Sequence, residues 1–221
     1  MSSPEHDPAG LDSAGLDSAA RDPAGLVAPV VAQVRALGRQ PVGDRAVVLI
    51  DGPSGAGKST LADALVAAWP GPDRPTLVRL DDIYPGWGGM DAAIGLIGSR
   101  LLTPRHAGRS AAWQRHDWAA DAPAEWHPVD PTRPLIIEGC GALARAHAGV
   151  SDVRVWLQAD DGIRKERALA RDNGGFEAHW DHWQQEWEAY LEREQPEQSA
   201  TLRLVAIPPA EPGGVSRLRR E

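Results

Sequence analysis

The run "DGPSGAGKST", residues 51–60, constrains the fold of this chain more than any other stretch. Gly52, Gly57, Lys58 and Ser59 match the phosphate-binding pattern G-x-x-x-x-G-K-[ST]. An apolar run that favours a buried strand precedes the pattern, and a helix-like run follows it, as the motif requires. The glycines let backbone N–H groups point at one anion, and the helix N-terminus adds a positive dipole. We therefore predict that the chain binds a nucleoside triphosphate.

Each part of this loop has an expected role. Lys58 is expected to reach the β- and γ-phosphates, and Ser59 is expected to hold Mg²⁺. The residues predicted to contact the nucleotide are Gly52, Ser54, Gly55, Ala56, Gly57, Lys58, Ser59 and Thr60.

Apolar runs alternate with amphipathic runs along most of the remaining chain. Strands alternating with helices favour a parallel sheet that is covered on both faces. We predict an α/β fold, a P-loop NTPase three-layer sandwich with a five-stranded, mostly parallel sheet. The predicted strands cover residues 45–52, 76–82, 133–140, 153–159 and 202–209, and the predicted helices cover 26–37 (interrupted near Pro29), 58–69, 161–172 and 176–193.

Composition marks the expected boundaries of this domain. Residues 1–26 repeat "DPAGL" and are rich in Ala, Gly, Asp, Ser and Pro, so we expect a disordered, low-complexity tail. The P-loop kinase domain is expected over residues 27–210, followed by a C-terminal tail over 211–221. Within the domain we expect a substrate-side insertion at 84–132, where the alternation stops, and a lid at 160–175.

Charge and composition limit the classes of partner. The net charge of -8 argues against a nucleic-acid partner bound through a basic field. No apolar run approaches the ~20 residues that cross a bilayer, and the first ten residues lack the features of a secretory signal. Cys140 is the only cysteine, which excludes an intramolecular disulfide and fits a reducing compartment. We expect a cytoplasmic protein that acts on a small molecule, and its oligomeric state stays open.

Motifs outside the loop separate the classes of P-loop protein. A GTPase usually carries N-K-x-D, but the only lysines here are Lys58 and Lys165, and the LSGGQ signature of transporter ATPases is also absent. Acidic residues instead follow two predicted strands, in "LDDIY" and "LIIEG". Because ligands bind at the carboxyl ends of strands in such sheets, Asp81, Asp82 and Glu138 are expected beside the loop. Phosphoryl transfer to a hydroxyl needs metal ligands and a proton acceptor of this kind.

Four segments together make the chain resemble the uridine kinase family, which groups with phosphoribulokinase and pantothenate kinase among P-loop small-molecule kinases. They are "IDGPSGAGKST", "LDDIY", "IIEGCGAL" and "RKERALARD", within about residues 45–207. The resemblance implies ATP and Mg²⁺ as cofactors. It implies that Asp81 accepts the hydroxyl proton of the acceptor near the metal, that Tyr84 lines the substrate site and that Glu138 lies near Mg²⁺.

The last of these segments resembles the lid helix of that family. Arg164, Arg167 and Arg171, followed by Asp172, are similar to the arginines that close over the phosphates of ATP. Arginine suits this role because its planar guanidinium binds two phosphate oxygens at once.

The substrate side of the family has a counterpart in "RHDWAADAPAEWH". Arg115, His116, Trp118 and His127 are the expected substrate contacts, by similarity to a Y-D-[FY] segment followed by His. His116 stands where the family has Tyr, and Trp118 where it has Phe or Tyr. The acceptor is therefore expected to be a nucleoside or another small hydroxylated metabolite.

Tryptophans fall into two groups with different expected roles. Those in the insertion can either stack on a planar substrate or pack a segment that has few aliphatic residues. The others lie at helical spacing with Phe176 and Tyr190, a pattern typical of the buried face of an amphipathic helix. The first group is Trp87, Trp113, Trp118 and Trp126, and the second is Trp180, Trp183 and Trp187.

Two hypotheses for function follow. In the first, the chain is an ATP- and Mg²⁺-dependent kinase in which Lys58 and Arg167 or Arg171 neutralise the transferring phosphoryl group. Ser59, Glu138 and Asp81 then hold the metal, and Asp81 is the base. In the second, the chain is a P-loop regulatory or accessory ATPase without a small-molecule acceptor, which needs Lys58 and Ser59 but not Asp81.

Overall fold

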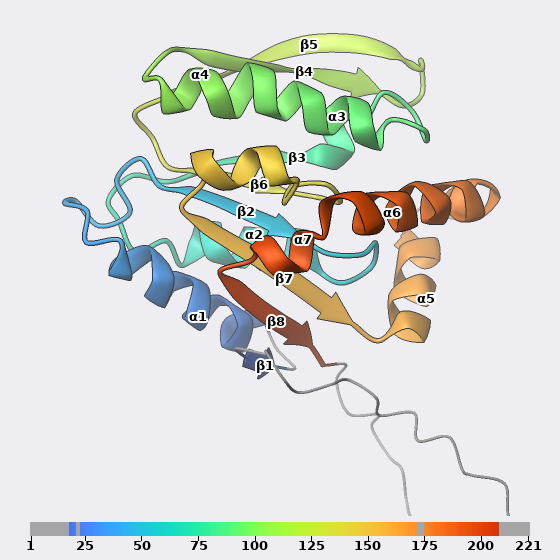
Figure 1. Ribbon diagram of the computed structural model, residues 1–221, viewed down its shortest axis with the longest axis horizontal. Coiled ribbons are helices and arrows are strands. Elements are labelled where there is room, and N and C mark those ends of the chain that lie inside the picture. Colours follow the sequence, from blue (N-terminus) through green and yellow to red (C-terminus); the bar gives the residue numbers. More distant parts are fainter. Residues whose placement is uncertain (1–17, 21–22, 172–174, 208–221) are drawn as a thin grey trace, which may run out of the picture.

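A parallel β-sheet forms the centre of the computed structural model, which describes residues 18–20, 23–171 and 175–207 (Figure 1). Its six strands lie in the order β1-β8-β7-β2-β6-β3. Since β2 lies between β6 and β7, its carboxyl end opens at the middle of one sheet edge, where ligands bind in folds of this type. The strands are β1 (Ser18–Ala20), β2 (Val47–Asp51), β3 (Thr76–Arg79), β6 (Leu135–Glu138), β7 (Val153–Ala159) and β8 (Leu202–Ala206).

Helices cover both faces of this sheet. The first half of the chain contributes α1 (Pro23–Ala36), α2 (Lys58–Ala67), α3 (Met90–Leu96) and α4 (Thr103–His106), with a π-helical segment at Ile97–Leu102 that joins α3 to α4. The second half contributes α5 (Asp161–Arg171), α6 (Trp180–Glu194) and α7 (Pro196–Ser199). Short 3₁₀ helices occur at Leu80–Asp82, Arg145–Val150 and Glu177–His179.

The side chains of β2 show how the two faces are divided. Val48 and Ile50 pack into a core with Leu65 of α2, whereas Leu49 packs into a second core with Trp187 of α6. Successive residues of a strand point to opposite faces, so an apolar run such as "VVLI" fills both cores at once. The result is a three-layer α/β sandwich with β2 at its centre.

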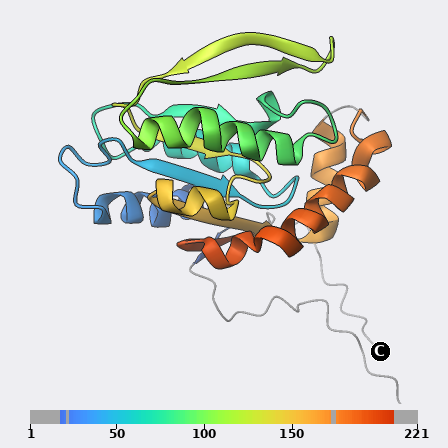
Figure 2. The ribbon, with the colours of Figure 1, turned by 45° about the horizontal axis from the view of Figure 1, so that its top comes forward.

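A β-hairpin stands apart from the main sheet. Strands β4 (Ala111–Asp117) and β5 (Ala122–Val129) pair antiparallel, with an irregularity between Gln114 and His116. Figures 1 and 2 show the hairpin lying over the α3–α4 segment, at the far side of these helices from the sheet. The hairpin and these helices make up most of residues 84–132.

The sequence predicted this architecture well, with two corrections near the N-terminus. All five predicted strands are present, as β2, β3, β6, β7 and β8, and the P-loop sandwich is confirmed. The disordered tail expected over 1–26 is wrong for the residues of this range that the structure describes, because Ser18–Ala20 pair with β8 and α1 begins at Pro23. Strand pairing uses backbone groups, which a low-complexity composition does not exclude. Residues 1–17 and the expected tail 211–221 lie outside the described residues.

The predicted interruption of the first helix is wrong. Pro29 lies inside a continuous α1. Proline removes only one backbone hydrogen bond there, and the fully buried Val30 and Val34 hold the helix on the sheet.

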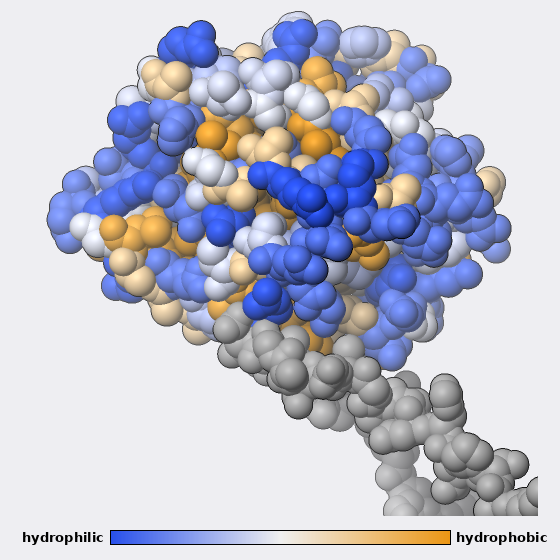
Figure 3. Space-filling view, in the orientation of Figure 1, coloured by the Kyte–Doolittle hydropathy of each residue, from blue (hydrophilic) through white to orange (hydrophobic). Residues whose placement is uncertain are grey.

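None of the helices in the described part of the chain combines the length and the apolar character that crossing a bilayer requires. On the face seen in Figure 3, hydrophilic side chains predominate and hydrophobic ones form small, separate areas.

Candidate active site

The phosphate loop, residues 52–57, joins the carboxyl end of β2 to the start of α2. Gly55 has φ 79°, and a Cβ at this position would overlap the carbonyl oxygen of Arg164 in α5. Gly57 has φ 99°, and a Cβ there would meet no atom within 4 Å. Glycine at 55 thus lets α5 pack directly on the loop. The space in front of Gly57 leaves the N-terminus of α2 open to an anion.

Lys58 is folded back onto the loop. Its Nζ donates to the carbonyl oxygens of Gly52 at 2.8 Å and Pro53 at 3.0 Å, and lies 3.5 Å from the Sγ of Cys140. Burial disfavours the charge, but the acidic groups around it, Cys140 and Glu138 foremost, outweigh this effect and raise the pKa of the ammonium. Lys58 is therefore a positive charge held at the floor of the loop.

Glu138, the last residue of β6, binds the start of α2. Ser59 Oγ donates to Glu138 Oε1 at 2.9 Å, and Arg79 Nε lies 3.6 Å from the same oxygen. The carboxyl is 3% exposed, and burial raises its pKa although Lys58 and the Ser59 hydrogen bond oppose the rise. The hydroxyl and carboxylate predicted to hold Mg²⁺ are thus in direct contact.

Two aspartates occupy the 3₁₀ turn that follows β3. The backbone carbonyl of Asp81 accepts a 2.8 Å hydrogen bond from Trp118 Nε1 of the hairpin, which fixes the turn against the insertion. Burial and the neighbouring charge of Asp81 raise the pKa of Asp82. The turn brings both carboxylates to the edge of the sheet where the phosphate loop lies, as predicted from "LDDIY".

A cavity of about 300 Å³, the phosphate cavity, lies in front of the loop. Asp81, Glu138, Cys140 and Arg167 line it together with residues of the loop and of α2. Of the predicted nucleotide contacts, two are buried and do not line it, Gly52 and Ala56, and six line it, Ser54, Gly55, Gly57, Lys58, Ser59 and Thr60.

A second cavity of about 490 Å³, the aromatic cavity, adjoins the first. Its wall is formed by five rings, Tyr84, Trp87, Trp118, Phe176 and Trp183, together with Arg79 and Asp82. Ser54, Ser59 and Asp81 line both cavities. The two cavities therefore meet at one carboxylate and two hydroxyls.

Tyr84 lies in the wall of the aromatic cavity, but its hydroxyl is hydrogen-bonded to the protein backbone. The side chain is 1% exposed, and its hydroxyl donates to the carbonyl oxygen of Cys140 at 2.7 Å. Its ring packs edge-on against Trp183. Burial raises the pKa of this phenol well above its ordinary value. Tyr84 thus offers a ring edge, with its polar end bonded to the segment after β6.

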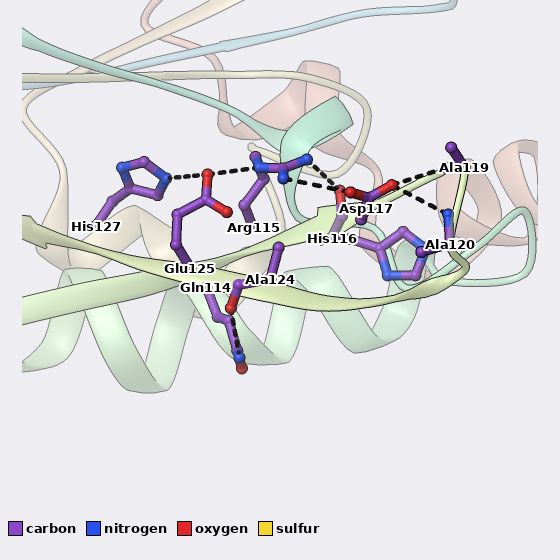
Figure 4. A network of polar contacts seen from close by, with 9 residues as sticks. All are labelled: Gln114, Arg115, His116, Asp117, Ala119, Ala120, Ala124, Glu125 and His127. Carbon is purple, nitrogen blue, oxygen red and sulfur yellow. Dashed lines mark hydrogen bonds and ion pairs between the residues drawn. The ribbon is translucent and has the colours of Figure 1, made fainter.

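The other predicted substrate contacts are divided by the hairpin. Figure 4 shows Arg115, Glu125 and His127 on one face and Gln114 and His116 on the other. Arg115 Nε binds Glu125 Oε1 at 2.7 Å, and this bond lowers the pKa of Glu125 to about 2. His127 Nε2 lies 3.3 Å from the same oxygen.

None of these three basic side chains lines the aromatic cavity. Arg115 and the buried His116 line a separate cavity of about 110 Å³ beneath the hairpin, and the ring of His127 stacks on Trp113 at 4.4 Å between centroids. Only Tyr84 and Trp118 among the predicted substrate contacts line the aromatic cavity. The hairpin therefore carries Arg115, His116 and His127 at positions outside the lining of the aromatic cavity.

The lid arginines also separate. Arg167 lines the phosphate cavity. Arg164 instead pairs with Asp161 at 2.6 Å and lies over the ring of Trp180 at 6.0 Å, outside the cavity lining. Arg171 ends α5, but its side chain and the whole of Asp172 lie outside the described residues.

Asp51 is a buried residue of the site that the motif reading missed. Its Oδ2 accepts hydrogen bonds from the Tyr190 hydroxyl at 2.6 Å and the Leu143 N–H at 2.8 Å, and its Oδ1 accepts one from Gly52 N–H at 2.7 Å. Burial raises the pKa of this carboxyl, although the hydrogen bonds lower it. Asp51 thereby fastens the start of the loop to α6 and to the segment after β6. The sequence places Asp51 directly before Gly52, but it does not indicate the hydrogen-bond partners of Asp51.

The aromatic stripe of α6 packs in the core, as predicted, and also touches the loop. Its four rings, Trp180, Trp183, Trp187 and Tyr190, are all buried, and so is Phe176, which lies before the 3₁₀ turn that precedes α6. Trp183 Nε1 donates to Ser54 Oγ at 3.0 Å. One face of α6 therefore serves the core, the aromatic cavity and the phosphate loop together.

Comparison with known proteins gives matches in structure only. Neither family models nor curated proteins match the chain. The solved structure of a possible uridine kinase from Bacillus stearothermophilus aligns over 80% of this chain and 99% of its own, with 17% identity and a TM-score of 0.53. A proposed fructose transport system kinase from Silicibacter sp. TM1040 aligns over 85% and 100%, with 20% identity and a TM-score of 0.52. The chain therefore has the P-loop fold of these two structures over nearly their whole length.

Proposed function

We propose that this chain is an ATP- and Mg²⁺-dependent phosphotransferase that moves the γ-phosphoryl group to a hydroxyl of a nucleoside or another small metabolite. The observation that carries the proposal is the position of Asp81, which lines both the phosphate cavity and the aromatic cavity. A carboxylate at such a junction can reach a hydroxyl on one side and a phosphoryl group on the other. The two structural neighbours named above, both described as kinases, support the same reading.

The residues of the phosphate cavity fit a nucleotide with its metal. The open space before Gly57 and the N-terminus of the ten-residue α2 suit phosphate oxygens. Among the described residues, no set of three or more His, Cys, Asp or Glu side chains forms a metal cage. Mg²⁺ at phosphate sites needs only one or two carboxylates, because phosphate oxygens and water complete its shell. Ser59, Glu138 and Asp81 meet that need.

ATP and Mg²⁺ supply the phosphoryl group and neutralise part of its charge. Lys58 and Arg167 provide positive charge from opposite sides of the cavity, the loop and the lid helix. Positive charge beside the phosphoryl group stabilises the negative charge that it carries during transfer. Lys58 must first release the carbonyl oxygens of Gly52 and Pro53. A bound phosphate then takes the place of these oxygens as the hydrogen-bond acceptor of its Nζ.

Asp81 accepts the proton of the acceptor hydroxyl. The 3₁₀ turn and the Trp118 hydrogen bond to its backbone hold it at the junction. Asp82 lines only the aromatic cavity, and its pKa is raised by burial and by Asp81, so it contacts the acceptor instead. The five rings bury the acceptor's flat or apolar parts and exclude water from the transfer.

The test is acceptor-stimulated release of ADP from ATP and Mg²⁺ across a panel of nucleosides, sugars and small polyols. We expect at least one compound to stimulate release and to yield a phosphorylated product by mass spectrometry. Asp81→Asn should lower kcat by about a hundredfold or more, because a general base contributes that much. Affinity for ADP without Mg²⁺ should stay within about threefold, since the loop is unchanged.

Asp82→Asn is the matched control, one residue away in the same turn. It should change the KM for the acceptor more than kcat. Slow ATP hydrolysis that no panel member stimulates, with Asp81→Asn at the wild-type rate, would favour the regulatory or accessory ATPase instead.

A further inference from the structure

A third large cavity, of about 350 Å³, opens at the sheet edge opposite the phosphate loop. It lies where β2 begins at Val47 and where α4 ends, at the left-hand side of Figure 1. The five residues of β2 span roughly 15 Å by the rise of a strand. The cavity is therefore separate from the site at Asp51 and Gly52, and we name it the basal cavity.

Charged side chains dominate the basal cavity. Arg39, Arg45, Arg105, Asp44 and Asp152 line it with His106, so three arginines face two aspartates. One pair is closed, because Arg39 binds Asp152 through two hydrogen bonds of 2.6 and 3.1 Å. Asp152 is further held by the Val47 N–H at 2.8 Å. Apart from this pair, two arginines, Arg45 and Arg105, face one aspartate, Asp44, so the cavity lining carries a net positive charge in a chain whose total is -8.

Arg105 is a buried cation that forms no direct ion pair with a described carboxylate, although Asp152 and Asp130 lie near enough to raise its pKa against the effect of burial. Its side chain is 3% exposed. Its two terminal nitrogens donate to the carbonyl oxygens of Pro131 and Arg133, and its Nε has no hydrogen-bond partner. Burial and the nearby charge of Arg45 lower its pKa. A buried charge is strongly destabilising unless an opposite charge compensates it.

Arg45 completes this arrangement. It is exposed, it has φ 49°, and no ion pair joins it to any described carboxylate. A guanidinium that is not engaged by an acid can offer paired N–H groups to an oxyanion. The cavity volume exceeds that of a bare phosphate and falls in the range of small-molecule sites.

We propose that the basal cavity binds a small phosphate-bearing molecule, with Arg45 contacting the phosphate and the buried charge of Arg105 attracting it. This site is independent of the proposed transfer reaction, because it shares no lining residue with the phosphate cavity or the aromatic cavity.

The experiment titrates inorganic phosphate into the full chain while ADP and Mg²⁺ fill the phosphate loop. Histidine ring signals are followed by NMR, and the signal of His106 is identified by its loss in His106→Gln. We expect a saturable shift of the His106 signal. Arg45→Gln should weaken phosphate binding about tenfold or more, since it removes a charge-assisted contact. The change keeps a non-glycine residue at the left-handed position, so backbone strain is the same.

Arg35→Gln is the control, an exposed arginine of α1 that lines none of these cavities. It should leave the affinity for phosphate unchanged. A titration with sodium chloride at equal ionic strength separates binding from screening. The proposal is overturned if phosphate moves the His106 signal no more than chloride does, or if Arg45→Gln binds phosphate as tightly as the unmodified chain.

Discussion

Ser59 Oγ donates a 2.9 Å hydrogen bond to Glu138 Oε1, which joins the first turn of α2 to the end of β6. These residues are 79 positions apart and belong to two different motifs. The contact brings a hydroxyl and a carboxylate to one side of the phosphate cavity. It also gives Glu138, which burial pushes toward its neutral form, a donor that favours the ionised form.

Glu138→Gln should therefore raise the Mg²⁺ concentration needed for half-maximal ADP release by about tenfold or more. The amide keeps the size of the side chain but removes a negative charge from the metal site. The measurement is initial rate against Mg²⁺ at saturating ATP. Glu188→Gln, at an exposed position of α6, should leave the curve in place. If the Mg²⁺ curves of Glu138→Gln and the unmodified chain overlap, Glu138 does not bind the metal.

Substitutions of Arg167 and Arg164 should have very different effects on kcat/KM for ATP, although the two residues lie three positions apart on α5. Arg167→Gln should lower kcat/KM for ATP by about tenfold to a hundredfold, because Arg167 lines the phosphate cavity. Arg164→Gln should lower it less than about threefold, because this side chain is engaged with Asp161 and Trp180. Steady-state kinetics of both variants measure these two effects. A larger loss of kcat/KM in Arg164→Gln than in Arg167→Gln would mean that α5 turns its other face to the nucleotide.

Tyr190→Phe should destabilise the fold in a way that depends on pH. The Tyr190 hydroxyl donates to the buried Asp51 carboxylate, and this bond is worth about 1.5–3 kcal/mol when the acceptor is charged. The folded pKa of Asp51 lies above its ordinary value of 3.8, so the folded state binds the extra proton and its contribution to stability is lost as pH rises through the folded pKa. Removing the hydroxyl raises that pKa further, so the loss caused by Tyr190→Phe should grow with rising pH.

Urea unfolding of both proteins between about pH 5 and about pH 9 measures this difference. Tyr84→Phe is the matched control. It removes the same hydroxyl from an equally buried ring, but its acceptor is the neutral carbonyl oxygen of Cys140. Its effect should not vary with pH. A Tyr190→Phe effect that is equally flat would mean that Asp51 keeps one protonation state across the range.

The parts of this molecule that sequence predicted well are those that local patterns determine. Apolar strands ending in Gly or an acid located Lys58, Asp81 and Glu138, because parallel strands bring their carboxyl ends together. The Asp51–Tyr190 bond could not be predicted, because it joins residues 139 positions apart and neither the loop motif nor the helical spacing of the rings specifies a partner. The hairpin was read only as an insertion, because its Trp-rich, half-exposed strands lack a clean alternation.

The positions of individual side chains were predicted wrongly where packing determines which of several neighbouring residues reaches the site. Arg115 and His116 were both assigned to the substrate, yet both line the cavity beneath the hairpin and not the aromatic cavity that Trp118 lines. On α5, Gly55 sets how the helix sits on the loop, and so which arginine reaches the phosphate cavity. Neither choice is encoded in the spacing of the arginines.

Trp118 and Trp126 are the two exposed large apolar side chains of the described residues, at 40% and 49%, and only Trp118 lines the aromatic cavity. Trp118→Phe should raise the KM for the stimulating acceptor by about tenfold, because it shortens the ring surface and removes the hydrogen bond that fixes the Asp81 turn. The KM for ATP should stay within about twofold. Trp126→Phe makes the same change beside Arg100, on the wall of the smaller cavity under the hairpin, and should leave both constants unaltered. Equal rises in acceptor KM for the two variants would place the acceptor under the hairpin, with Arg115 and His116, instead of in the aromatic cavity.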